Sequence, residues 1–276
     1  MTYARSRRRG LSLVEVLIAV ILLGIVGVGI TRLLQSQMRF FSRSTNARDA
    51  RAVTRNALSL VSTEMAMIEP RGIVAASADS FMVRLPYAVG LLCTGSTVTF
   101  APVDSLVWAQ AVYAGYAYRD TTAAAVTTYV ANGGSALGTG LDVTCMLAGF
   151  AVVPSGRTRV VAPAMPITTQ GAPVLLYQTV TYKIAASSIV SGRTALWRRV
   201  AGGSNEEVAV PFGTGTRFRF YVSGGLTPQD AVPGTLNTIT GLEFVMVGES
   251  ERTSPGINRV EKDTLRVPIL FRNAVQ

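Results

Sequence analysis

The feature that most constrains the fold of this 276-residue chain is an apolar run of about twenty residues that begins at Leu11. An apolar helix of about 20 residues matches the hydrocarbon core of a bilayer. Four arginines precede the run: Arg5, Arg7, Arg8 and Arg9. We expect them to keep their end of the helix in the cytoplasm, because positive flanks of membrane helices stay inside.

Three interpretations of this N-terminus compete. A secretory signal peptide has a shorter apolar stretch, of about 7–15 residues, followed by a small-residue cleavage site, and neither fits here. A plain signal anchor fits the length but leaves Glu15 unexplained, because a carboxylate in hydrocarbon costs on the order of several kcal/mol. In the third interpretation the chain is cut between Gly10 and Leu11, and the new α-amine of Leu11 pairs with Glu15 of a neighbouring subunit.

The segment RRRG-LSLVEVLIAVILLGIVGVGI resembles the N-terminal signature of type IV prepilins and type II secretion pseudopilins. That signature has a basic leader ending in glycine, an apolar first mature residue, Ser or Thr next, and Glu at the fifth mature position. Gly10, Leu11, Ser12 and Glu15 match it, although Leu11 stands where Phe or Met is more usual.

The resemblance implies a route of maturation. A prepilin peptidase is expected to cut after Gly10 and to N-methylate Leu11. Glu15 is then expected to neutralise the amine of a neighbouring subunit and set the subunit register. The resemblance also implies a protein of the bacterial inner membrane, with its head in the periplasm, that later joins other pilins or pseudopilins in a filament.

The helix is predicted to continue beyond the membrane as far as Ile68. From Thr31 to Ile68 there is neither proline nor glycine, and apolar residues recur at helical spacing. Pro70 and Gly72 are expected to end it. The predicted organisation is a cleaved leader at 1–10, a membrane and filament-core helix at 11–31, its periplasmic continuation at 32–69, and a β-rich head at 70–276.

The outer half of the predicted helix is basic. It carries one aspartate, Asp49, and six arginines: Arg32, Arg39, Arg43, Arg48, Arg51 and Arg55. Lipid phosphates or DNA would be functional partners for such a stripe, but no interleaved aromatic pattern for reading bases is present. We interpret the stripe as a solvated or subunit-facing surface and do not expect nucleic acid as a partner.

Beyond Gly72 the chain consists of short β-like runs separated by turn residues. In RFRFYV, Phe218 and Phe220 alternate with Arg217 and Arg219, which is typical of antiparallel sheet with one solvated face. The predicted strands include Phe81–Leu85, Leu106–Tyr118, Arg217–Val222, Ile239–Val247 and Leu265–Phe271. The predicted fold class is therefore α+β and pilin-like, with a long N-terminal α-helix packed on a largely antiparallel sheet.

The order of runs from TVTYKI to LEFVMV resembles the C-terminal half of J-type minor pseudopilins and PilW-like minor pilins. This resemblance implies a minor subunit that primes a type IV pilus or a type II secretion pseudopilus, and the sequence does not separate the two systems. Residues 86–172 are predicted to form an inserted β region. A hypothesis of another class is a membrane-anchored adhesin or DNA-uptake module that uses this region.

Composition removes several kinds of chemistry. The chain has no histidine, which excludes Ser/His/Asp and Cys/His triads and imidazole zinc sites. We predict no catalytic residue, metal ligand or cofactor, and therefore a chain that is not an enzyme. Six carboxylates without EF-hand spacing are expected in turns or at strand ends: Glu206, Glu207, Glu249, Glu251, Glu261 and Asp263.

The two cysteines, Cys93 and Cys145, are too far apart in sequence for a CxxC motif. If the body of the chain lies outside the cytoplasm, we expect them to form a disulfide, since exported domains oxidise paired cysteines. The alternative is a pair of buried thiols that pack as small hydrophobic side chains.

Overall fold

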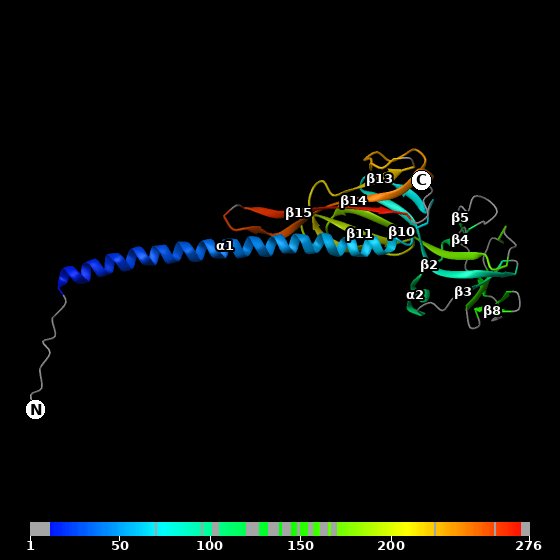
Figure 1. Cartoon of the computed structure of the whole chain (residues 1–276), viewed down its shortest axis with the longest axis horizontal. Coiled ribbons are helices and arrows are strands. Elements are labelled where there is room, and N and C mark those ends of the chain that lie inside the picture. Colours follow the sequence, from blue (N-terminus) through cyan, green and yellow to red (C-terminus); the bar gives the residue numbers. More distant parts are fainter. Residues whose placement is uncertain are drawn as a thin grey trace, which may run out of the picture.

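The structure is a computed structural model that describes residues 12–271, apart from 70, 95, 101–104, 120–126, 132–137, 140–144, 148–149, 154–156, 161–164, 167–169, 224 and 257. A single long helix, α1 (Leu13–Met65), projects from a β-rich head, and its N-terminal half stands clear of the head (Figure 1). The long helix and the largely antiparallel sheet confirm the predicted α+β, pilin-like class.

Only the outer half of α1 contributes to the core of the head. Its buried residues recur every three or four positions and therefore form one stripe on one face: Asn46, Ala50, Thr54, Ala57, Val61 and Met65. The helix has 53 residues and is about 80 Å long at 1.5 Å per residue. Its apolar N-terminal half thus extends far beyond the head (Figure 1).

The head is built from fifteen described strands. They are β1 (Ile73–Ala76), β2 (Ser80–Thr94), β3 (Thr97–Phe100), β4 (Gly115–Arg119), β5 (Thr127–Ala131), β6 (Gly138–Thr139), β7 (Cys145–Leu147), β8 (Phe150–Val153), β9 (Arg157–Val160), β10 (Pro173–Ala186), β11 (Thr194–Val200), β12 (Glu206–Phe212), β13 (Arg217–Val222), β14 (Ile239–Ser254) and β15 (Arg259–Leu270). The described pairings are antiparallel. The main sheet runs in the order β13-β14-β12-β11-β10-β2-β3-β9-β6, and β15 also pairs with β14.

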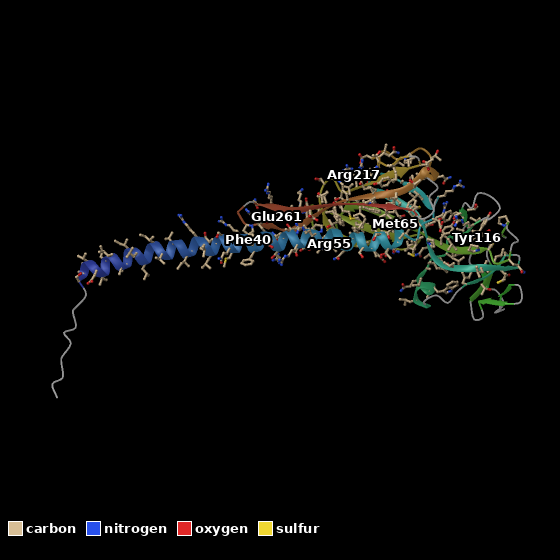
Figure 2. The ribbon with its side chains drawn as sticks, viewed as in Figure 1. Phe40, Arg55, Met65, Tyr116, Arg217 and Glu261 are labelled. Carbon is tan, nitrogen blue, oxygen red and sulfur yellow. The ribbon has the colours of Figure 1, made fainter. Side chains whose placement is uncertain are left out.

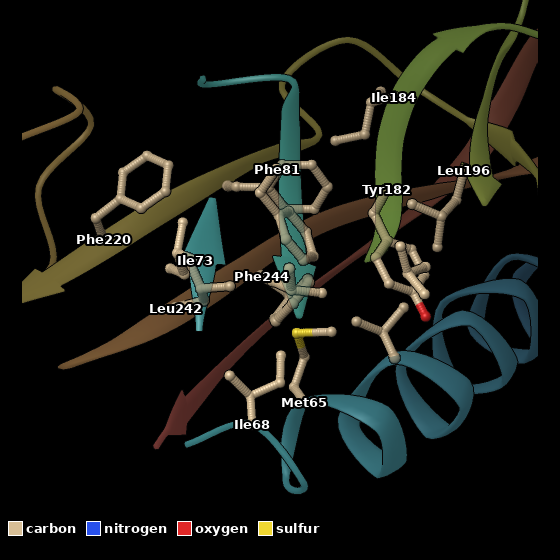
Figure 3. Close-up of a cluster of buried hydrophobic side chains, with 14 of the residues drawn as sticks. Met65, Ile68, Ile73, Phe81, Tyr182, Ile184, Leu196, Phe220, Leu242 and Phe244 are labelled. Carbon is tan, nitrogen blue, oxygen red and sulfur yellow. The ribbon is translucent and has the colours of Figure 1, made fainter. Parts of the chain in front are cut away.

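The first of two apolar cores lies between α1 and the sheet. Figure 3 shows Met65 and Ile68, from the end of α1 and the turn after it, pointing into this core. Phe81 is its hub. The Phe81 ring centroid lies 5.2 Å from that of Tyr182, 4.7 Å from that of Phe218 and 5.8 Å from that of Phe244. Edge-to-face and stacked aromatic contacts of this kind stabilise a core beyond the area that they bury.

The second core lies beyond the end of α1, around the far parts of β2 and β10 (Figure 1). Leu92 of β2, Phe100 of β3, Tyr116 of β4 and Leu176 of β10 are buried there. β2 pairs with β10 from Ser80 to Leu91, so the same two strands pass through both cores. Of the described strands at 86–172, β3, β4, β5, β6 and β9 join the main sheet, whereas β7 and β8 form a separate two-stranded sheet.

The predicted strand Leu106–Tyr118 is wrong. Ser105–Gln110 forms the short helix α2, and within the predicted stretch only the residues from Gly115 onward are extended, as β4. The helical turn brings the Trp108 ring to within 6.2 Å of Tyr87 and 5.8 Å of Phe100, measured between ring centroids. This contact is tertiary and overrides the local β-like pattern.

The predicted placement of several carboxylates is also wrong. Glu249 and Glu251 lie within β14, and Glu261 and Asp263 lie within β15. Both strands extend beyond their apolar alternating segments, because polar side-chain contacts hold the rest of the hairpin together. Glu249, for example, is 2% exposed and forms an ion pair with Lys262 on the neighbouring strand, with 2.7 Å between Nζ and Oε1.

Close approach of β14 to α1 gives a first prediction. A Cβ atom added at Gly248 would lie 2.4 Å from the carbonyl oxygen of Ala50 and 2.7 Å from Cγ2 of Thr54. We expect Gly248→Ala to push α1 off the sheet and lower the free energy of unfolding by about 1–3 kcal/mol, the usual cost of overpacking. Urea denaturation of the chain in detergent measures this loss.

Gly234→Ala is the matched control, because nothing lies within 4 Å of a Cβ atom added at Gly234. Its free energy of unfolding should change by less than about 0.5 kcal/mol, as for most surface substitutions. Equal and small effects of the two variants would contradict the close helix–sheet contact.

Candidate functional site

The described part of the N-terminal site begins at Ser12, because Gly10 and Leu11 lie outside the described residues. Ser12 is the N-cap of α1. The Glu15 amide donates to Ser12 Oγ at 3.2 Å, and the Ser12 amide donates to Glu15 Oε2 at 3.2 Å. This reciprocal capping box satisfies two donors that the helix cannot satisfy internally. It holds the Glu15 carboxylate against the backbone amide of Ser12.

The capping role of Glu15 is one that sequence analysis missed. The spacing of Ser12 and Glu15 is the S-x-x-E pattern that predicts a capping box. Only Oε2 of Glu15 is used in the cap, and within the described part of the chain Oε1 has no hydrogen-bond partner. Capping therefore leaves one carboxylate oxygen available to a cation from another molecule.

The apolar half of α1 has no protein around it in the single chain. An 18-residue window of this helix has a mean hydropathy of 2.8, and none of that window is buried. The helix is long and apolar enough to cross a membrane. Figure 2 shows side chains projecting from it along its whole free length. A bilayer or other helices must cover this surface to remove it from water.

A buried polar cluster ties α1 to the sheet. Arg198 of β11 pairs with Glu64 of α1, with 3.0 Å between Nη2 and Oε1, and both side chains are mostly buried. The Tyr182 hydroxyl of β10 also donates to Glu64. Burial, followed by the nearby Glu64 charge, raises the pKa of Tyr182 far above its ordinary value, so this hydroxyl stays a donor. The cluster fixes the helix on the head.

Glu249 is a second buried carboxylate in contact with basic side chains. It pairs with Arg193 at 3.0 Å between Oε2 and Nη1, in addition to its pair with Lys262. Among the described residues, no three His, Cys, Asp or Glu side chains are grouped closely enough to hold a metal ion. The ion pairs of Glu64 and Glu249 join strands to one another and to α1.

The structure has Cys93 in a disulfide. Cys93 is half-buried near the end of β2, and its sulfur lies 2.9 Å from Thr99 Oγ1. The other cysteine of the sequence, Cys145, lies in β7, which packs against β2, but its side chain is outside the described residues. Pairing of Cys93 with Cys145 therefore stays a prediction.

Comparison with known proteins finds a match at the N-terminus of the chain. Residues 5–31 match the family model described as the prokaryotic N-terminal methylation motif. The match covers Gly10, Leu11, Glu15 and most of the apolar half of α1. No curated protein and no solved structure matches the chain. The match supports a relationship to type IV prepilin-like proteins, which the N-terminal residues had indicated on their own.

Proposed function

We propose that this chain is a minor pilin or minor pseudopilin, a structural subunit of a type IV pilus or a type II secretion pseudopilus. The observation that carries the proposal is the apolar half of α1. It is uncovered in the single chain, has Glu15 in its first turn, and bears the methylation motif. In this proposal a prepilin peptidase cuts the Gly10–Leu11 bond and methylates the amine of Leu11.

Before assembly, α1 anchors the chain in the inner membrane. The leader arginines keep the N-terminus in the cytoplasm, so the head lies in the periplasm. That compartment is oxidising and suits the disulfide of Cys93, for which we propose Cys145 as the partner.

During assembly, the apolar halves of several subunits pack together. Glu15 Oε1 then accepts a hydrogen bond from the Leu11 amine of a neighbour, while Oε2 keeps its bond to the Ser12 amide. Charge pairs are strong in surroundings of low dielectric constant, because water no longer screens them. A subunit shifted along the bundle loses this pair, so Glu15 sets the register.

The head follows the helix as one rigid unit. Glu64 and Arg198 fix one part of the outer half of α1. Asn46 fixes another part, because its Nδ2 donates to Ser254 Oγ at 3.2 Å. The position of α1 in a filament therefore determines where the head lies. We propose a J-type or PilW-like subunit, a choice supported by the strand order from β10 to β14.

Location and filament recovery test this function. An epitope inserted at Ile189, which is 71% exposed in the turn between β10 and β11, should not disturb the core. We expect the tagged chain in the inner-membrane fraction, open to protease from the periplasmic side only, and recovered with isolated filaments when its partner subunits are co-expressed. A cytosolic marker protein must stay protected. A soluble chain, or an epitope on the cytoplasmic side, would contradict the proposal.

A further inference from the structure

We propose that the free end of the β14–β15 hairpin, together with the adjacent part of α1, binds anionic phospholipid headgroups at the periplasmic membrane surface. We call the described part of the hairpin from Glu251 to Arg259, which leaves out residue 257, the arm. The proposal rests on the membrane anchoring of α1 proposed above, and it adds a second, peripheral contact between the head and the membrane.

The arm runs along α1 towards the membrane half of the helix (Figure 1). Its turn lies beside Arg39, since a Cβ atom added at Gly256 would be 3.6 Å from Cζ of Arg39. Asn46 Nδ2 donates to Ser254 Oγ at 3.2 Å and to the Arg252 carbonyl oxygen at 3.3 Å. Ser254 Oγ in turn donates to Glu261 Oε1 at 2.9 Å. These bonds hold the arm against the helix.

The position of Arg39 along α1 places the arm at headgroup level. Leu33 and Leu34, the last residues of the apolar half, are 58% and 49% exposed. At 1.5 Å per residue, Arg39 lies about 8 Å beyond Leu34 and about 14 Å beyond Ile30. The polar layer on each side of a bilayer is roughly 5–8 Å thick, and charges act about 8 Å further at physiological salt. The turn of the arm is therefore within reach of lipid phosphates.

Exposed arginines gather on the arm and on the part of α1 from Arg32 to Asn46. There are five, and none is in an ion pair among the described residues: Arg32, Arg39, Arg43, Arg252 and Arg259. Arg252 lies at the level of Asn46, about 10 Å farther from the membrane than Arg39. The exposed carboxylate of the arm is Glu251. Farther from the membrane, Arg51 pairs with Asp263 at 3.5 Å between Nε and Oδ1, whereas Arg48 and Arg55 are exposed and form no ion pair among the described residues. Unpaired arginines at a bilayer surface attract anionic lipid.

Two aromatic side chains follow Arg39 directly in α1. Phe40 and Phe41 are 69% and 66% exposed, and Figure 2 shows Phe40 on α1 close to the arm. Exposed aromatic rings beside arginines are typical of surfaces that lie in the boundary between headgroups and acyl chains. Before assembly, anchoring of α1 in the bilayer also places the arm next to the membrane surface. We therefore assign the site to lipid and not to an acidic protein.

The test uses the full chain reconstituted in vesicles of phosphatidylcholine, with or without phosphatidylglycerol. We expect amide hydrogen exchange in the arm to be about five-fold slower with phosphatidylglycerol, because anionic lipid attracts the arginines. High salt should remove the difference. The double variant Arg252→Gln/Arg259→Gln should also lose it.

The double variant Lys183→Gln/Arg199→Gln is the matched control. It removes two positive charges from exposed positions on β10 and β11, outside the arm, and should keep the slow exchange. Equal exchange rates in the arm with both lipids would overturn the proposal. Protection that rises with protein concentration in the vesicles, and not with phosphatidylglycerol, would overturn it in favour of a second copy of the chain.

Flotation of the vesicles separates this inference from the proposed function. A chain that floats with both lipids but has an unprotected arm refutes only the headgroup contact. A chain that floats with neither lipid refutes the membrane anchoring, and the headgroup contact with it.

Discussion

Replacement of Glu15 by glutamine is expected to abolish incorporation into filaments while leaving cleavage and membrane insertion intact. The reason is the loss of charge at a position that faces hydrocarbon or other helices. Breaking a buried ion pair by removing one partner costs about 3–5 kcal/mol, which corresponds to a drop in incorporation of more than about 100-fold. Recovery of the tagged chain with isolated filaments measures this drop.

A comparison with Ser12→Ala separates the charge of Glu15 from its capping role. Glutamine at position 15 still accepts the hydrogen bond from the Ser12 amide, so Glu15→Gln keeps the cap and removes only the charge. Ser12→Ala removes the cap at a cost of about 1 kcal/mol and keeps the charge, so this variant should still assemble. Normal incorporation of Glu15→Gln, or equal failure of Ser12→Ala, would show that the charge is not what assembly requires.

Phe81→Ala is expected to cause the largest loss of stability in the head. Phe81 is 1% exposed and contacts three other aromatic rings, from β10, β13 and β14. Removing a buried phenyl ring leaves a cavity and costs about 3–5 kcal/mol. Urea denaturation in detergent, followed by near-ultraviolet circular dichroism, measures the change in free energy of unfolding.

The control for Phe81→Ala is Ile189→Ala, at a position that is 71% exposed. We expect this control to change the free energy of unfolding by less than about 0.5 kcal/mol. A loss below about 1 kcal/mol for Phe81→Ala would mean that the aromatic cluster is not the centre of the core.

The helix and the apolar strands could be predicted from the sequence because their patterns are local. Absence of proline and glycine after Thr31 predicted a helix to Ile68, and α1 ends at Met65. The alternation in RFRFYV predicted the bounds of β13, Arg217–Val222, and the burial of Phe218 and Phe220. In both cases one face is apolar, so the period of the pattern determines the structure.

The arm could not be predicted, because its local sequence has no apolar alternation. The sequence predicted strands only to Val247 and from Leu265, whereas β14 continues to Ser254 and β15 begins at Arg259. Contacts from distant elements hold these polar residues in place, among them Asn46 of α1. Such contacts depend on the packing of the whole chain and are invisible in a short window of sequence.

The candidate site is the opposite case. The roles of Gly10, Leu11 and Glu15 are predicted from sequence alone, because the leader, the apolar run and the lone carboxylate lie together, and these roles stay predictions. The structure shows a capping box between Ser12 and Glu15, which their spacing also predicts. In this box Oε2 of Glu15 accepts a hydrogen bond, and Oε1 does not take part. In the proposed assembly, that division lets Glu15 cap its own helix with Oε2 and pair with a neighbouring subunit through Oε1.

The most direct test of the account is the mass of the mature N-terminus. The chain should be co-expressed with a prepilin peptidase, purified from membranes and analysed by intact-mass and N-terminal peptide mass spectrometry. We predict a chain that begins at Leu11 with one methyl group on its α-amine, and a Gly10→Val control that keeps residues 1–10. An unmodified chain that still begins at the leader, in the presence of active peptidase, would contradict the assignment as a type IV prepilin-like subunit.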